Sequence, residues 1–321
     1  MPDLKITFAC GLYDRLLPLY RGDVKPEGIA LDFLAIDDPR QVFDRMAKGE
    51  FDASEMSSSE FVRMVAAGDS PLVAIPVFVS RLFRHSFIFV NAKSGISAPK
   101  DLAGKTIGVS AYTQTAAVFI RGLLQHEYGV DLSTVRWIQG PMNGKGGHPS
   151  LPALSKPIRI ELDKTGKALS ELLAAGEIDA TLGALVPDSF GAHPDVRRLI
   201  PNFRDVEKDY YRRTRIFPIM HLIAIKRALY EEHPFVAASL YAALSHAKAL
   251  ACERMREVGA LAYMTPWLAD DIREMDEVFG GDAWPYGIAP NRPSLEALVA
   301  YMAEQGMIPA PLKVEDLFVA V

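Results

Sequence analysis

The sequence predicts an α/β fold with largely parallel sheets, built as two domains. Short apolar runs alternate with amphipathic segments, which is the pattern of strands linked by helices. The chain has 321 residues, 49% of them hydrophobic, which is enough for two cores of ordinary size. With a formal net charge of only −5, this composition excludes a mainly disordered chain. It also argues against nucleic acid as a partner, because a polyanion binder would be basic.

In the first part of the chain, strands are expected over residues 4–9, 28–36, 51–54, 73–79 and 87–90. A helix is expected over 39–48, because Val42, Phe43 and Met46 share one face and Gly49 follows. A second helix is expected over 60–67, after three serines that can cap it.

The second part continues the alternation of strands and helices. Strands are expected over 106–110, 135–139, 178–185 and 219–225, and helices over 113–128, 168–175, 234–258, 267–278 and 294–305. Gly129 and Gly176 follow two of these helices, where a left-handed residue often ends a helix. Residues 140–157 are rich in Gly, Ser and Pro and predict a long loop.

The cysteines and the apolar runs indicate the cellular compartment of the protein. Cys10 and Cys252 are too far apart in sequence to indicate a disulfide framework or a zinc site. The first residues lack a basic stretch followed by an apolar one, so we expect no secretory signal. Apolar runs such as 71–79 fall short of the ~20 residues that cross a bilayer. We therefore expect a cytoplasmic protein without a membrane partner.

Several motifs resemble one known family. They are Ser-Arg-Leu-Phe-Arg-His-Ser at 80–86, Asp-Leu-Ala-Gly-Lys at 101–105, the segment 115–130, Phe-Pro-Ile-Met-His at 217–221 and Trp-Pro-Tyr-Gly at 284–287. Together they resemble the 4,5-dihydroxyphthalate decarboxylase family, from about Lys5 to Phe318. The first and fourth motifs are the most specific ones.

The resemblance implies a type II periplasmic-binding-protein-like fold. In that fold two α/β lobes are joined by two crossover segments, and the ligand lies between the lobes. One lobe would be discontinuous, formed by residues 1–90 and 221–321, and the other would be formed by 91–220.

The resemblance also implies a lyase that acts in phthalate catabolism. The implied reaction is the non-oxidative decarboxylation of 4,5-dihydroxyphthalate to protocatechuate and CO2, without a required cofactor. Two alternatives stay open: a cytoplasmic solute-binding or sensor protein for a small anion, and a decarboxylase of a related aromatic acid, with the loop 140–157 setting selectivity. A homo-oligomer is also left open.

Arg81, Arg84 and His85 lie within five residues at the end of a predicted strand region. Decarboxylation of a dicarboxylic acid needs cations that hold carboxylates and a group that moves protons. We expect Arg81 or Arg84 to bind a substrate carboxylate and His85 to take part in proton transfer. The alternative is a structural salt bridge.

His221 stands inside an otherwise apolar strand pattern, and a buried polar side chain needs a partner. If the two crossovers lie side by side, His85 and His221 approach each other and share the acid and base roles. A divalent metal held by His85, His221 and a carboxylate is the open alternative. A neutral histidine bonded to the backbone would be the plainer one.

Two helix starts are candidate anion sites, because helix N-termini attract negative charge. Ser57 and Ser58 precede one helix, and Thr113, Gln114 and Thr115 precede the other. Simple capping is the alternative for both.

Asp188 follows a predicted strand and is a candidate base, with a loop-capping role as the alternative. Glu55 is a weaker candidate for the same task. Trp284 and Tyr286 are expected to pack rather than stack on substrate. Arg121 is expected to form a structural ion pair.

Overall fold

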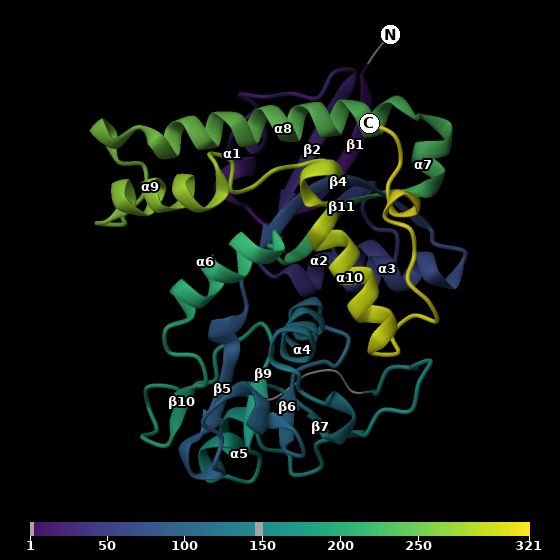
Figure 1. Cartoon of the computed structure of the whole chain (residues 1–321). Helices are drawn as coiled ribbons and strands as arrows, with labels where there is room; N and C mark the ends of the chain where they lie inside the picture. Colours follow the sequence, from purple (N-terminus) through teal and green to yellow (C-terminus); the bar gives the residue numbers. More distant parts are fainter. Residues whose placement is uncertain (1–2, 145–149) are drawn as a thin grey trace. The chain divides into compact units, whose positions relative to one another are not determined.

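A computed structural model describes residues 3–144 and 150–321, and the chain divides into two compact units. The first unit combines the chain up to Arg81 with Ile219–Arg292 and Leu312–Val321. The second unit combines Leu82–Pro218 with Pro293–Pro311. Figure 1 shows the elements of both units.

The first unit is built on a sheet of five strands in the order β2-β1-β3-β11-β4. The strands are β1 (Leu4–Cys10), β2 (Ile29–Ala35), β3 (Ala53–Ser57), β4 (Leu72–Arg81) and β11 (Ile219–Lys226). β1 is parallel to β2 and β3, whereas β11 is antiparallel to both β3 and β4. The register places Ile223 opposite Glu55 and His221 opposite Ser57. The strand β11, which comes late in the chain, thus lies beside β3 and brings His221 close to Glu55 and Ser57.

The helices of the first unit are α1 (Leu17–Tyr20), α2 (Pro39–Ala47), α3 (Ser58–Ala67), α7 (Arg227–Glu232), α8 (Phe235–Arg256) and α9 (Leu268–Phe279). Val236, Leu240 and Leu244 of α8 pack into the same apolar core as β1, β4 and β11. Among the described residues α8 is the one helix long and apolar enough to cross a membrane by length and composition alone. The buried face of α8 is that of a core helix, and core helices pass the same test.

The second unit has a sheet of six strands in the order β10-β5-β9-β6-β7-β8. The strands are β5 (Ile88–Asn91), β6 (Thr106–Val109), β7 (Arg136–Gln139), β8 (Ile160–Leu162), β9 (Ala180–Leu182) and β10 (Val196–Arg198). β9, β6, β7 and β8 are parallel, and β5 and β10 add an antiparallel edge. The helices α4 (Thr115–Tyr128), α5 (Leu169–Ala175) and α6 (Phe203–Thr214) belong to this unit.

The helix α10 (Arg292–Glu304) packs against α4, which is why residues 293–311 join the second unit. A Cβ at Gly122 of α4 would lie 2.1 Å from the ring of Tyr301. Behind it, the Nε of Arg121 donates to Oε1 of Gln305 at 2.8 Å. The units therefore differ from the predicted lobes in three segments. Residues 293–311 join the second unit because α10 packs against α4, and residues 82–90 join it because β5 belongs to its sheet. Residues 219–220 begin β11 and belong to the first unit.

Most predicted elements are present, with shifted ends. The helix expected over 113–128 begins at Thr115, and Gly129 and Gly176 end α4 and α5 with positive φ angles of 63° and 74°. The strand expected over 178–185 is shorter, because the chain turns at Gly183, whose φ is 151°. The described parts of 140–157 contain no helix or strand, and residues 145–149 lie outside the described residues.

Candidate functional site

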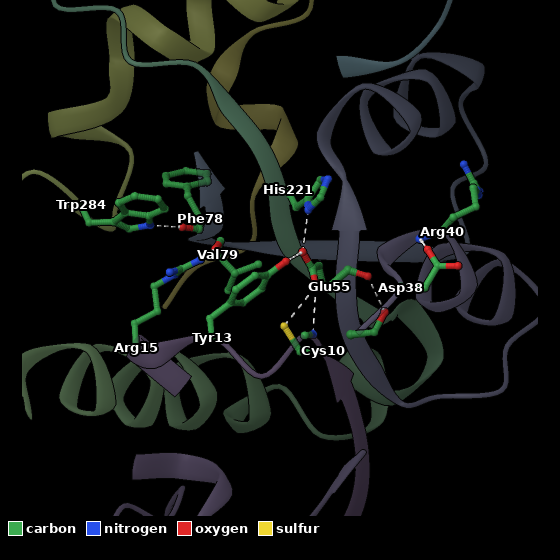
Figure 2. A network of polar contacts seen from close by, with 12 residues as sticks. Cys10, Tyr13, Arg15, Asp38, Arg40, Glu55, Phe78, Val79, His221 and Trp284 are labelled. Carbon is green, nitrogen blue, oxygen red and sulfur yellow. Dashed lines mark hydrogen bonds and ion pairs between the residues drawn. The ribbon is translucent and has the colours of Figure 1, made fainter. Parts of the chain in front are cut away.

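Glu55 and His221 form a buried acid–imidazole pair in the first unit. Glu55 comes from the middle of β3 and His221 from β11, and Nδ1 of His221 lies 2.6 Å from Oε1 of Glu55. The Glu55 side chain has no exposed surface, whereas the His221 side chain is 18% exposed. Figure 2 shows the two side chains pointing toward one another.

Glu55 accepts three further contacts from the end of β1. The hydroxyl of Tyr13 donates to Oε1 at 2.7 Å, and the backbone N–H of Gly11 donates to Oε2 at 3.1 Å. The thiol of Cys10 also points to Oε2, at 3.4 Å. Burial alone would raise the pKa of Glu55, but the hydrogen bonds from His221, Tyr13 and Gly11 outweigh it and hold that pKa below its usual range. Glu55 is therefore a fixed anion.

A fixed carboxylate on one ring nitrogen of an imidazole sets its orientation and stabilises its protonated form. The ring of Phe43 from α2 meets the imidazole edge-on, with centroids 4.9 Å apart. Within the part of the chain that the structure describes, the hydrogen bond of His221 is made by Nδ1, and Nε2 has no hydrogen-bond partner. The pair can thus present one oriented N–H to a ligand and take a proton back.

The three serines expected to start a helix lie at the start of α3, next to this pair. Ser57 is the N-cap residue, but its side chain makes no capping bond and lies 3.3 Å from the hydroxyl of Ser59. The hydroxyl of Ser58 is completely buried and has no hydrogen-bond partner among the described residues. The side chain of Ser57 therefore does not cap α3.

Arg81 ends β4 and is buried. Its Nη1 donates to Oδ1 of Asn291 at 2.7 Å, and the amide of Asn291 donates in turn to the carbonyls of Pro285 and Gly287. Arg81 is thus tied to the Trp-Pro-Tyr-Gly turn. Its role as a carboxylate ligand stays a prediction.

In the second unit, Arg84 and His85 are buried together. The guanidinium of Arg84 lies over the ring of Phe87 at 4.7 Å, and within the described residues it has no carboxylate partner. Burial lowers the pKa of Arg84 to about 10, against an opposing effect of Glu207. A buried cation without a carboxylate in direct contact is costly, so a carboxylate ligand would be favoured here.

His85 has a carboxylate of its own. Nδ1 lies 3.5 Å from Oε1 of Glu207, which accepts the backbone N–H of His85 at 3.1 Å. The ring of Tyr210 meets the imidazole at 5.2 Å between centroids. Neither ring nitrogen of His85 has a hydrogen-bond partner among the described residues, and the side chain is only 3% exposed.

The second helix start is held from inside its own unit. Gln114 is the N-cap residue of α4, and its Oε1 accepts the backbone N–H of Ala184, just after β9, at 3.1 Å. Thr115 is buried and Thr113 half-buried. Asp188 is exposed, and its backbone N–H donates to Oδ1 of Asn143. The ligand-binding role of Thr113, Gln114 and Thr115 stays a prediction, as does the role of Asp188 as a base.

The two histidines belong to different units, and each has a different glutamate: Glu55 for His221 and Glu207 for His85. That His85 and His221 share the acid and base roles stays a prediction. In residues 3–144 and 150–321, no three or more His, Cys, Asp or Glu side chains are grouped as metal ligands. That the reaction requires no cofactor also stays a prediction.

Of the remaining predictions from the sequence, one is wrong and one is confirmed. The prediction of an ion pair for Arg121 is wrong. Within the described residues this buried side chain bonds only to Gln305, the carbonyl of Tyr112 and the sulfur of Met307. Trp284 packs, as expected, against the guanidinium of Arg15 at 4.5 Å. Tyr13 and Glu207 were not anticipated, since no local motif marks either residue.

Comparisons with known proteins decide the family. A 4,5-dihydroxyphthalate decarboxylase of Comamonas testosteroni is 36% identical over 322 residues, which covers 99% of this chain and 97% of that protein. The chain belongs to the 4,5-dihydroxyphthalate decarboxylase family. A second member, from Pseudomonas putida, is 35% identical over 66% of this chain and 83% of its own length.

The fold of this family member is that of type II periplasmic binding proteins, as predicted. The periplasmic aliphatic sulphonate binding protein from Escherichia coli superposes with a TM-score of 0.54, at 13% identity, over 100% of this chain and 92% of its own. The family model described as "ABC transporter, phosphonate, periplasmic substrate-binding protein" matches residues 26–144. These likenesses concern the fold alone.

Proposed function

We propose that this protein catalyses the non-oxidative decarboxylation of a hydroxylated aromatic dicarboxylic acid, with 4,5-dihydroxyphthalate as substrate and protocatechuate and CO2 as products. The relatives carry that name, and the substrate class follows from it. The observation on which the proposal depends is the Glu55–His221 pair, with its 2.6 Å contact and its second ring nitrogen left for a ligand. The reaction needs such a proton donor.

The chemistry sets what the residues must do. The hydroxyl para to the departing carboxylate releases its proton and pushes electron density onto the ring carbon. That carbon takes a proton, for which we propose Nε2–H of His221 as the donor. The bond to the carboxylate then breaks, CO2 leaves, and the ring regains its aromaticity as the oxygen is reprotonated. Glu55 stabilises the imidazolium before the transfer.

The anionic groups of the substrate need cations and hydrogen-bond donors. We propose Arg84 as a carboxylate ligand, because its buried guanidinium has no carboxylate partner within its unit. Ser58 and the starts of α3 and α4 are proposed as further donors. The proposed role of His85 as a second proton-transfer group rests on its ring nitrogens, neither of which has a hydrogen-bond partner within the described residues.

The test is CO2 release from 4,5-dihydroxyphthalate by the purified protein, with and without a chelator. Release in both arms is expected. We expect His221→Gln and His85→Gln to lower kcat by about 10²-fold or more, as for a lost general acid, with substrate binding largely kept. Normal turnover in either variant would remove that histidine from the reaction.

A solute-binding protein is the second candidate, favoured by the match of residues 26–144 to a binding-protein family. Binding of 4,5-dihydroxyphthalate without CO2 release would select it. Release that is lost only with the chelator would instead point to a metal-dependent reaction.

A further inference from the structure

Tyr13 and His221 contact the same carboxylate oxygen, Oε1 of Glu55. The Tyr13 hydroxyl donates to Oε1 of Glu55 at 2.7 Å, and Nδ1 of His221 reaches the same oxygen at 2.6 Å. Burial and the neighbouring Glu55 raise the pKa of the Tyr13 phenol, so it remains a donor. Two donors on one oxygen divide its negative charge between them. The strength of one contact therefore depends on the other.

Tyr13 is held in place by a stack of side chains (Figure 2). The guanidinium of Arg15 lies 4.3 Å from the Tyr13 ring and 4.5 Å from the Trp284 ring. Arg15 donates to the carbonyl of Val79, and Nε1 of Trp284 donates to the carbonyl of Phe78 at 2.7 Å. Both anchors are backbone groups of β4, so the stack is fixed to the sheet.

The backbone before Tyr13 is shaped for the same contact. A Cβ at Gly11 would lie 3.0 Å from Cζ and 3.2 Å from the hydroxyl oxygen of Tyr13. Only glycine leaves that space open, and the N–H of Gly11 itself donates to Oε2 of Glu55. The segment after β1 thus brings the phenol onto the carboxylate.

We propose that Tyr13 is a positioning residue that sets how strongly Glu55 holds the proton of His221, with Arg15 and Trp284 fixing the phenol. This rests on the proposed role of His221 in proton transfer. A hydrogen bond from Tyr13 draws negative charge from Oε1, which weakens the hold on the imidazolium and makes His221 a better proton donor.

Within the part of the chain that the structure describes, few other titratable or charged groups lie around the pair. Cys10 faces Oε2 of Glu55 from β1. On the side of α2, the guanidinium of Arg40 lies over Phe43 at 5.4 Å and is paired with Asp44 and Glu60. On β4, Arg81 bonds Asn291. None of these groups contacts Oε1. The contact of Tyr13 with Oε1 can therefore be removed on its own, by deleting the single hydroxyl oxygen of Tyr13.

The experiment compares Tyr13→Phe with Glu55→Gln in the full chain, using NMR titration of a ring-labelled His221. Loss of the phenol hydroxyl leaves more charge on Glu55, so the His221 titration should move to higher pH by roughly one pH unit, a tenfold change in proton affinity. Loss of the carboxylate charge should move it to lower pH. The basic limb of the kcat profile should follow in the same directions.

Opposite shifts in the two variants are what a merely structural role would not give. An unchanged His221 titration in Tyr13→Phe, or a shift in the same direction as Glu55→Gln, would overturn the proposal. Arg15→Lys serves as the second variant, because it loosens the stack without removing the hydroxyl, and a smaller upward shift is expected. The titration needs no substrate, so opposite shifts in a protein that releases no CO2 would overturn the proposed function alone.

Discussion

At the scale of single residues, Glu55 decides most about the site. It is a carboxylate without exposed surface that keeps its charge because His221, Tyr13 and Gly11 all donate to it. Removing such a charge while keeping the side-chain shape leaves three donors without a charged acceptor. The acidic group is therefore part of the stability of the first unit as well as of its chemistry.

The pH dependence of stability follows from the sign of the shift. The pKa of Glu55 is lower in the folded state than in the unfolded chain, so its contribution is present above the unfolded value and is lost as the pH falls through the folded value. We expect Glu55→Gln to lower the free energy of unfolding at pH 7 by about 1.5–3 kcal/mol. The difference between variant and wild type should shrink below about pH 4. Urea unfolding at pH 7 and at lower pH measures it, and a pH-independent difference would contradict this account.

The sequence indicated His221 and, as a weaker candidate, Glu55, but not that the two side chains meet or that Tyr13 joins them. A histidine inside an apolar strand is visible as a pattern, whereas Tyr13 and Glu55 are far apart in sequence. They meet because β1 and β3 are parallel neighbours, with Ala9 opposite Ser54. Which strands become neighbours is decided by long-range packing, and no local motif encodes it.

At the scale of elements, the contact of α4 with α10 shows what the periodicity of the sequence misses. Both helices were predicted from the sequence, but their packing together was not. Gly122 allows Tyr301 to approach the helix backbone, and Gln305 bonds Arg121 just beyond. The strands β8 and β10 were missed for another reason, since each has three residues, too few for an alternating pattern.

Gly122→Ala tests that packing. Alanine favours a helix over glycine by about 1 kcal/mol, so an exposed site would gain stability. Here the new methyl group would meet the Tyr301 ring at 2.1 Å, and we expect a net loss of about 1–3 kcal/mol in the free energy of unfolding. Tyr301→Ala is the matched partner in a double-mutant cycle. If Gly122→Ala remains equally destabilising without the Tyr301 ring, the clash is not its cause.

At the scale of the whole molecule, the two-lobe fold was predictable from the family motifs but the assignment of segments was not. Residues 82–90 and 293–311 belong to the second unit, because β5 joins its sheet and α10 covers α4. Each unit carries its own histidine–glutamate pair, and the second also carries a buried cation without a carboxylate. A carboxylate ligand that binds this cation should therefore stabilise the second unit.

That expectation can be measured with phthalate, which has both carboxylates but lacks the hydroxyl that drives CO2 loss. A ligand that binds only the folded protein raises the free energy of unfolding by about 2.7 kcal/mol at a hundred times its Kd. We expect phthalate to raise the thermal midpoint of the wild type and to have much less effect on Arg84→Met, because within the described residues the buried guanidinium of Arg84 has no carboxylate in ion-pair contact. Arg136→Met is the matched control, since Arg136 is exposed and already paired with Glu161. Equal stabilisation of Arg84→Met and wild type would show that Arg84 does not bind the carboxylate.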